Sequence, residues 1–319
     1  MVSARMGDEQ MTHSIRRGSF RSRGQRLAYT IHGTGDRPFV LLPGLLLPAR
    51  MNTPLAAHLA ERGHRVILLD PLGQGESARP MDMWRYSMTQ FARDVVALLD
   101  HLGLDQAVVG GTSLGANITL EVASLAPERL RAMVVEMPVL DNGLVASAIT
   151  FAPLLVAVTL GGRLMRVVSR LARLIPSSRT PFNLDILLDG VRQDPGPSGA
   201  LLQGVFFGRT APHREERRTF TAPALVIGHH RDPVHPFSDA GMLSRELPNG
   251  RLIEASSILE MRMRPDRLYG EIDAFLDQVW GPRMRLVQRR RARPTAPSTR
   301  RTAQRRAAAG TGRARRTRA

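Results

Sequence analysis

The chain has 319 residues, of which 43% are hydrophobic and none is cysteine. This length suffices for one large α/β domain with an insertion. The lack of cysteine excludes disulfides, thiolate metal ligands and a cysteine nucleophile. The formal net charge of +17 is typical of nucleic-acid binding, but it belongs to the two ends. Residues 283–319 hold fourteen arginines and no acidic residue, and residues 1–26 hold six arginines against two acidic residues. Residues 27–282 are therefore close to neutral.

Both ends have the composition of disordered segments. Residues 1–18 form a polar leader without the apolar stretch of a secretory signal. Residues 283–319 are rich in Arg, Ala, Thr and Pro and lack the apolar surface that would stabilise a fold. We expect this tail to bind an anionic partner nonspecifically, either nucleic acid or a membrane surface. The sequence is typical of a cytoplasmic protein, with a membrane-peripheral location as the alternative, and it does not indicate an oligomeric state.

Between the ends, in residues 19–282, short apolar runs alternate with helical patterns. Strands are predicted, in chain order, at 27–32, 39–42, 65–70, 106–110, 130–137, 224–228 and 251–254. Helices are predicted at 53–62, 87–102, 114–125, near 239–247, and at 265–280. Strands that alternate with helices of this length predict an α/β fold with a mostly parallel sheet flanked by helices.

One segment, about residues 140–221, contains only helical and loop signals and is predicted to be an inserted helical cap. Within it, residues 143–160 are apolar over a length that could cross a bilayer. Pro153 and the position between two core strands favour a cap helix over the active end of the sheet, which implies a lipophilic pocket. The arginines that follow share one helical face, which is either solvated or directed at anionic lipid headgroups; they are Arg163, Arg166, Arg170 and Arg173.

The strongest local motif is Gly111-Thr112-Ser113-Leu114-Gly115, which lies between a predicted buried strand and a predicted helix. A nucleophilic serine on such a sharp turn needs small neighbours, and the two glycines provide that clearance. The start of the helix places positive potential beside the serine, and the backbone N–H of Leu114 can donate to an oxyanion. The motif therefore predicts a nucleophile elbow at Ser113.

From about residue 24 to residue 279 the sequence resembles the cap-containing branch of the α/β-hydrolase superfamily. Besides the elbow, residues 41–45 (LLPGL) resemble the oxyanion loop, with Pro43 where the family usually has histidine. Residues 70–77 (DPLGQGES) match the family's D-x-x-G-x-G-x-S turn, for which we expect a structural role. Residues 223–228, followed by Asp232, resemble the strand and loop that carry the catalytic acid. The resemblance implies an α/β-hydrolase fold, the Leu45 amide as second oxyanion donor and Asp232 as the residue that orients the base, with no cofactor or metal.

The base departs from the family pattern. The family keeps a histidine after the last strand, and the corresponding residues 255–264 contain none. His229, His230 and His235 flank Asp232, and His235 is the nearest candidate base by topology. Glu260 is an alternative base. The alternative acids are Glu136, at the end of the strand predicted at 130–137, and Asp141, which follows this strand.

Three functions remain open at this point. The first is a serine esterase that acts on a small lipophilic ester or a related carbonyl compound. The second is a catalytically degenerate homologue that binds a ligand or partner in the inherited pocket. The third is attachment to an anionic surface through the basic tail. A serine without a base is a poor nucleophile, so the position of an imidazole relative to Ser113 separates the first function from the second.

Overall fold

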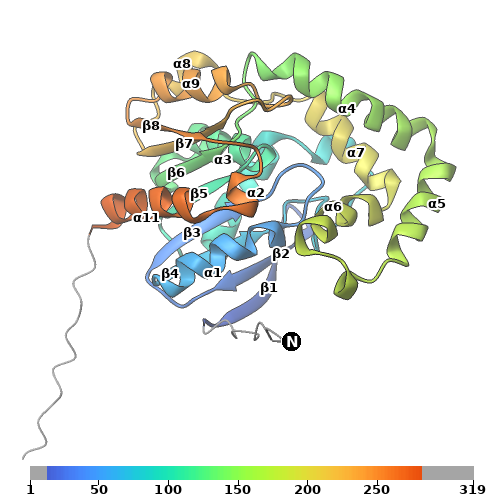
Figure 1. The fold of residues 1–319 in the computed structure, drawn as a ribbon, viewed down its shortest axis with the longest axis horizontal. Helices are drawn as coiled ribbons and strands as arrows, with labels where there is room; N and C mark the ends of the chain where they lie inside the picture. The colour runs from blue at the N-terminus through green and yellow to red at the C-terminus, as the bar shows by residue number, and fades with distance from the viewer. Residues whose placement is uncertain (1–12, 282–319) are drawn as a thin grey trace, which may run out of the picture. The chain divides into compact units, whose positions relative to one another are not determined.

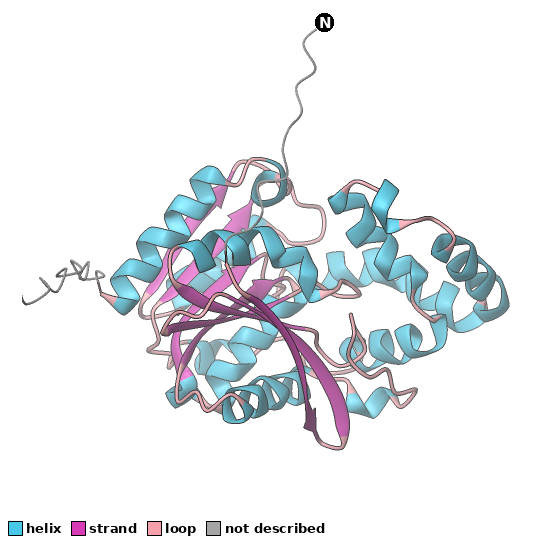
Figure 2. Ribbon diagram, turned by 90° about the horizontal axis from the view of Figure 1, so that it is seen from below, coloured by secondary structure: helices cyan, strands magenta, loops and turns pink. Residues whose placement is uncertain are grey.

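The computed structural model describes residues 13–281, which form one eight-stranded sheet with helices on both faces (Figures 1 and 2). The strand order is β1-β2-β4-β3-β5-β6-β7-β8; β1 and β2 run antiparallel to their neighbours, and β3 to β8 are parallel. The strands are β1 (Ile15–Ser22), β2 (Gln25–His32), β3 (Arg37–Leu42), β4 (His64–Leu69), β5 (Ala107–Thr112), β6 (Leu130–Glu136), β7 (Ala224–His229) and β8 (Gly250–Ala255).

Helices occupy the connections between consecutive strands from β3 to β8, and two more follow β8. The α-helices are α1 (Thr53–Glu61), α2 (Met88–His101), α3 (Leu114–Leu125), α4 (Gly143–Leu160), α5 (Gly162–Arg173), α6 (Phe182–Arg192), α7 (Pro195–Phe206), α8 (Arg214–Arg217), α9 (Phe237–Glu246), α10 (Glu260–Met263) and α11 (Asp266–Trp280). Short 3₁₀ helices are η1 (Ala49–Asn52), η2 (Met83–Arg85), η3 (Pro127–Arg129) and η4 (Ser177–Arg179). The mostly parallel sheet with flanking helices is the predicted fold class.

The central strands are apolar on both sides because both faces of the sheet are covered. Along β3, Val40 and Leu42 pack into one buried cluster, whereas Phe39 and Leu41 pack into the other. Successive side chains of a strand point to opposite faces, so a continuous apolar run supplies both clusters. Helices α2, α3 and α9 cover the first face, and α1 and α11 cover the second.

The predicted boundary of the leader is wrong at its end. Residues 15–18 are not disordered: they belong to β1, which pairs with β2 from Ile15 opposite His32 to Ser22 opposite Gln25. Only Phe20 and Ser22 of this edge strand are buried. Its other positions can therefore hold polar residues, and the sequence of the strand resembles that of a polar segment. Backbone pairing with β2 accounts for the ordered strand. The rest of the predicted leader, residues 1–12, and the predicted tail, residues 283–319, lie outside the described residues.

Helices α4 to α8 lie between β6 and β7, in the segment predicted to be a cap, and are called the cap below; the larger of them extend to one side of the sheet in Figure 1. Its first residues are held by the buried carboxylate of Asp239 on α9. This carboxylate accepts backbone N–H groups from Leu140 at 2.7 Å, Asn142 at 3.1 Å and Gly143 at 2.9 Å. Amides at the start of a helix have no acceptor within the helix, so Asp239 anchors the N-terminus of α4 to the core.

The D-x-x-G-x-G-x-S turn forms a small hydrogen-bonded frame after β4. The carboxylate of Asp70 accepts the amides of Ala49 at 2.7 Å and Glu76 at 2.9 Å. The hydroxyl of Ser77 donates to the Asp70 carbonyl at 2.6 Å and accepts the Ala28 amide at 2.9 Å. Gly75 has a φ of 50°, and a β-carbon there would lie 2.0 Å from the Asp70 carboxyl group. These contacts are structural: they fix the loop before η1.

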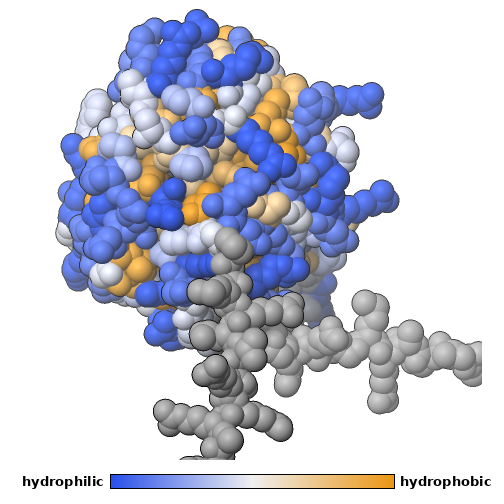
Figure 3. All heavy atoms as spheres, turned by 90° about the vertical axis from the view of Figure 1, so that its left-hand side faces the viewer, coloured by the Kyte–Doolittle hydropathy of each residue, from blue (hydrophilic) through white to orange (hydrophobic). Residues whose placement is uncertain are grey.

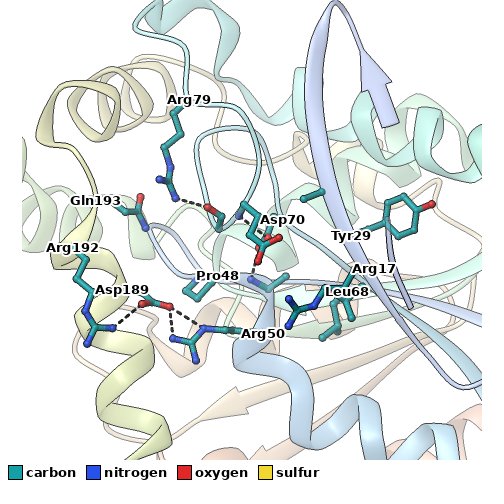
Figure 4. A pocket seen from close by; sticks show the side chains of 15 residues that line it. Arg17, Tyr29, Pro48, Arg50, Leu68, Asp70, Arg79, Asp189, Arg192 and Gln193 are labelled. Carbon is teal, nitrogen blue, oxygen red and sulfur yellow. Dashed lines mark hydrogen bonds and ion pairs between the residues drawn. The ribbon is translucent and has the colours of Figure 1, made fainter. Parts of the chain in front are cut away.

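Beside this turn lies a polar pocket of about 300 Å³, in which Arg50 and Arg192 pair with Asp189 (Figure 4). Arg50 donates to Asp189 and, at 2.6 Å, to Asp185. Arg192 donates to Asp185 at 2.7 Å and to Asp189 at 3.0 Å. Arg50 belongs to η1, and the other three belong to α6. Because the two aspartates are each shared by two arginines, the network ties α6 of the cap to the core.

Candidate active site

Ser113 lies between the end of β5 and the start of α3, on a strained backbone. Its φ is 54° and its ψ is −108°, a region that non-glycine residues rarely adopt. The Ser113 amide donates to the Glu136 carbonyl at 2.9 Å, and the Gly115 amide donates to the Pro43 carbonyl at 3.1 Å. Both bonds join the turn to neighbouring segments of the sheet. They hold the hydroxyl at the carboxyl edge of the sheet, which is where ligands bind in folds of this class.

The elbow leaves no room for a side chain at its second glycine. A β-carbon on Gly115 would lie 2.5 Å from the Leu42 carbonyl oxygen. We therefore expect Gly115→Ala to lower the free energy of unfolding by about 2 kcal/mol or more. Gly270, on the exposed side of α11, has nothing within 4 Å of such a carbon, so Gly270→Ala should be neutral or stabilising. Chemical denaturation of both variants tests this contrast, and an unchanged Gly115→Ala midpoint would contradict it.

Ser113, His235 and Asp232 lie in one hydrogen-bonded chain. His235 Nε2 is 2.8 Å from Ser113 Oγ, and His235 Nδ1 is 2.9 Å from Asp232 Oδ2. His235 and Asp232 both come from the loop between β7 and α9, and their side chains are 14% and 5% exposed. With the proton on Nδ1, that N–H donates to Asp232 and Nε2 accepts the serine hydroxyl. This is the polarity that a serine nucleophile requires.

The loop that carries Asp232 and His235 brings the two side chains together by a local turn. Oδ1 of Asp232 accepts the amides of Val234 at 2.8 Å and His235 at 3.0 Å, the pattern of an Asx turn. Arg231, just before it, has a φ of 59°. Burial raises the pKa of Asp232, but the hydrogen bonds and charge of His235 and the Val234 amide outweigh burial, so this pKa lies below its ordinary value. The carboxylate is therefore ionised where it faces the imidazole.

The alternative candidates are engaged elsewhere. His229 is buried and bonds to the Ser257 carbonyl at 2.8 Å, and His230 stacks on the Phe237 ring. Glu260 accepts the Ser256 hydroxyl at 2.6 Å and Arg267 at 2.8 Å. Asp141 is exposed and lies 3.4 Å from Arg217. Of the three histidines around Asp232, only His235 reaches Ser113. Within residues 13–281, no group of three or more His, Asp or Glu side chains is arranged to hold a metal ion.

A mostly apolar cavity of about 250 Å³ opens beside Ser113, and Leu45 and Leu114 line it with the serine. Leu114 is the first residue of α3, so its amide has no acceptor within the helix. The cap closes the cavity from the other side through α4 and α7, and the α4 contribution is Leu144, Ser147, Ala148 and Phe151. Asn117 of α3 joins core to cap, since its side chain donates to the carbonyls of Val139 and Thr210 at 2.7 and 2.8 Å.

Behind the elbow lies a buried charged cluster that the sequence analysis does not identify. Glu136 accepts the hydroxyl of Thr112 and, at 3.2 Å, the guanidinium of Arg262, and it lies 3.3 Å from His229 Nε2. Burial raises the pKa of Glu136, but Arg262, His229 and Thr112 outweigh burial and lower this pKa to about 2. The one feature that could have indicated this cluster is that Thr112 and Glu136 end adjacent strands. Arg262 and His229 come from distant segments.

This cluster makes a prediction for acid stability. A carboxyl group whose pKa is lower in the folded state stabilises the fold above its unfolded pKa, and that stabilisation is lost as the pH falls towards the folded value. For Glu136 the window runs from 4.5 down to about 2. Arg262→Met removes the main charge that lowers this pKa, so we expect acid unfolding to begin at a higher pH than in the wild type. Circular dichroism during acid titration measures this midpoint. An unchanged or lower midpoint would show that Arg262 does not stabilise the ionised carboxylate.

Comparison with known proteins agrees with the fold. Residues 37–158 match the family model described as the alpha/beta hydrolase fold. The matched residues include Leu45 and Ser113 and end before Asp232 and His235. A protein of Azorhizobium caulinodans, provisionally named a carbamate hydrolase, is 40% identical over 109 residues, which are 34% of this chain and 40% of that protein. The chain covers 28% and 41% of two further curated relatives, so these matches span well under half of each relative's length.

Solved structures agree over most of the domain. The enol-lactonase of Burkholderia xenovorans LB400 superposes with a TM-score of 0.66 at 23% identity and covers 81% of this chain and 99% of its own. An esterase of Rhodococcus sp. ECU1013 gives a TM-score of 0.66 at 20% identity, with coverage of 83% and 99%. At such identities the likeness establishes the fold alone. The family match over residues 37–158, the strand order and the likeness to solved structures together show that this chain has the α/β-hydrolase fold.

Proposed function

We propose that this protein is a serine hydrolase that cleaves a small lipophilic carboxylic ester. The observation that carries the proposal is the continuous chain from Ser113 Oγ through the His235 ring to Asp232, at 2.8 and 2.9 Å. These lengths are in the range through which a base accepts a proton during nucleophilic attack. The family's usual base is missing from the loop after β8, and in this proposal His235 on the loop after β7 takes its role.

The reaction then follows from the residues in two steps. Ser113 Oγ attacks the ester carbonyl while His235 Nε2 takes its proton, and the N–H groups of Leu45 and Leu114 stabilise the oxyanion. His235 returns the proton to the departing alcohol, which leaves an acyl group on Ser113. Water attacks this acyl-enzyme with His235 again as base, the acid is released and Ser113 regains its proton. Asp232 orients the ring and stabilises its charged form.

The cavity supports a neutral, apolar substrate. None of the side chains that line it is charged, and its polar groups are Ser113, Asn117, Ser147 and Thr210. A charged substrate group would lose its hydration there without a partner. The volume of about 250 Å³ lies just below the range of about 300–1,000 Å³ that is usual for drug-sized ligands, which favours a small acyl or alcohol group. The names of the structural neighbours, an enol-lactonase and an esterase, are consistent with this class.

A substrate panel tests the proposal. Wild type and Ser113→Ala are assayed on neutral p-nitrophenyl esters of increasing acyl length, on an ester of equal length with a terminal carboxylate, and on an epoxide and a haloalkane. We expect turnover of the short neutral esters, weaker turnover of the anionic ester, and loss of turnover by about 10⁴-fold or more in Ser113→Ala. Equal turnover in both proteins would contradict the proposal. Binding of esters without any turnover would favour the degenerate, ligand-binding alternative.

The arginine-rich tail supports a second, separate proposal. Residues 283–319 carry fourteen arginines without an acidic residue, so we propose that they bind nucleic acid or another polyanion nonspecifically. Removal of these residues should abolish DNA binding at low salt and leave ester turnover unchanged, and the affinity of the full chain should fall steeply with salt. A loss of turnover on truncation would contradict the independence of tail and active site.

A further inference from the structure

Exposed apolar side chains are concentrated on the cap. Of the 23 large hydrophobic side chains that are exposed in the described residues, 15 lie within residues 144–191. On the side of α11 and β8, by contrast, the surface is mostly hydrophilic and its apolar patches are interrupted by polar side chains (Figure 3). Single exposed apolar residues are ordinary, but a large contiguous group marks an interaction surface.

Helix α4 contributes an outer apolar stripe. Its inner face lines the cavity beside Ser113, whereas Val145, Ile149, Val156 and Leu160 recur at helical spacing on the other face. Ile149 is 71% exposed and Leu160 is 82% exposed. The stripe runs for about 22 Å along the helix. A helix that is apolar all round is normally buried or in lipid, yet only 11% of α4 is buried within the protein.

Helix α5 has three distinct faces. The buried face is formed by Ser169 and Ala172, with the partly buried Met165 beside them. A second face is exposed and apolar, and it consists of Leu164, Val167, Val168 and Leu171. The third is the predicted arginine face, Arg163, Arg166, Arg170 and Arg173, and none of these side chains pairs with a carboxylate within residues 13–281. Arg173 donates to the Arg192 carbonyl at 2.8 Å. An exposed apolar stripe beside a stripe of arginines without carboxylate partners is the pattern of a helix that lies in a membrane interface.

We propose that the outer face of α4 and α5 docks on an anionic lipid bilayer. The apolar stripes would enter the region between headgroups and acyl chains, and the arginines of α5 would contact anionic headgroups. Helix α4 lies on the bilayer and does not span it, because Asp239 fixes the amide of its first residue, Gly143, to the core and Val158 near its end is buried. The inner face of the same helix borders the cavity, so the docked cap places that cavity beside the source of lipophilic molecules.

Co-sedimentation with vesicles tests the docking. The full chain is mixed with vesicles of phosphatidylcholine alone or with roughly one third phosphatidylglycerol. We expect binding to the anionic vesicles, part of which persists at about 0.5 M salt because apolar insertion is not screened. Replacement of Leu160, Leu164 and Leu171 by serine should weaken binding by roughly ten-fold or more. Replacement of Arg163, Arg166 and Arg170 by glutamine should weaken binding to the anionic vesicles and leave binding to phosphatidylcholine vesicles unchanged.

Matched controls separate the cap from the tail and from catalysis. Serine at Ile15, Leu125 and Leu259, or glutamine at Arg16, Arg93 and Arg245, changes exposed residues outside the cap and should leave binding unchanged. Ser113→Ala should also bind normally, because docking does not depend on catalysis. If vesicle binding disappears at high salt and is unaffected by the cap substitutions, the tail is responsible for the binding and the proposal is overturned. Self-association that the leucine substitutions abolish, without vesicle binding, would identify a second copy as the occupant instead and overturn it equally.

Discussion

His235→Ala is expected to lower kcat for ester hydrolysis by about 10⁴-fold or more, since it removes the only imidazole of the Asp232 loop that reaches Ser113. The proposed nucleophile and oxyanion donors stay in place, so a small residual rate above that in water should remain. Initial rates at saturating ester measure this change. Circular dichroism verifies that the variant is folded.

The matched control is His230→Ala. His230 lies on the same loop, is exposed and stacks on Phe237 without contact to Ser113. Its removal should leave kcat within about two-fold of wild type. If His235→Ala kept wild-type turnover while Ser113→Ala lost it, another group would be the base and the relocated histidine would be the wrong assignment.

Asp232→Asn is expected to cost about 10⁴-fold in kcat with little change in KM. The amide keeps an oxygen that can accept the Val234 and His235 backbone N–H groups, so the turn should persist. The opposite atom becomes an NH₂ donor towards His235 Nδ1, which forces the ring proton onto Nε2. The ring can then no longer accept the serine proton. Asp141→Asn, at the exposed alternative acid, should leave turnover unchanged. If instead Asp141→Asn lost turnover and Asp232→Asn kept it, Asp141 after β6 would be the acid.

Much of the fold is readable from local patterns, because the central strands are apolar on both faces and the elbow requires glycine. The β5–α3 turn appears at the predicted residues. The edge strand β1 is not readable, since only Phe20 and Ser22 of its side chains are buried and its order comes from pairing with β2. Periodicity identifies the arginine face of α5 but does not reveal that its apolar stripe also faces outward, since that depends on which face packs on the cap.

The candidate site is likewise predictable from local sequence patterns only in part. Ser113 follows from a local motif, and the family resemblance supplies Asp232. The contact between His235 and Ser113 depends on how one loop turns, through Arg231 in a left-handed conformation and the Asx turn at Asp232. The Glu136 cluster combines four separate segments of the chain. Spacing in the sequence contains no information about such long-range contacts.

The most direct test of a serine hydrolase with a relocated base is the rate at which a fluorophosphonate modifies the protein, with the adduct located by mass spectrometry. We expect a stoichiometric adduct on Ser113 in the wild type and in His230→Ala. We expect no adduct in Ser113→Ala and a rate lower by about 10³-fold or more in His235→Ala. An adduct on another residue, or equal rates in wild type and His235→Ala, would contradict it.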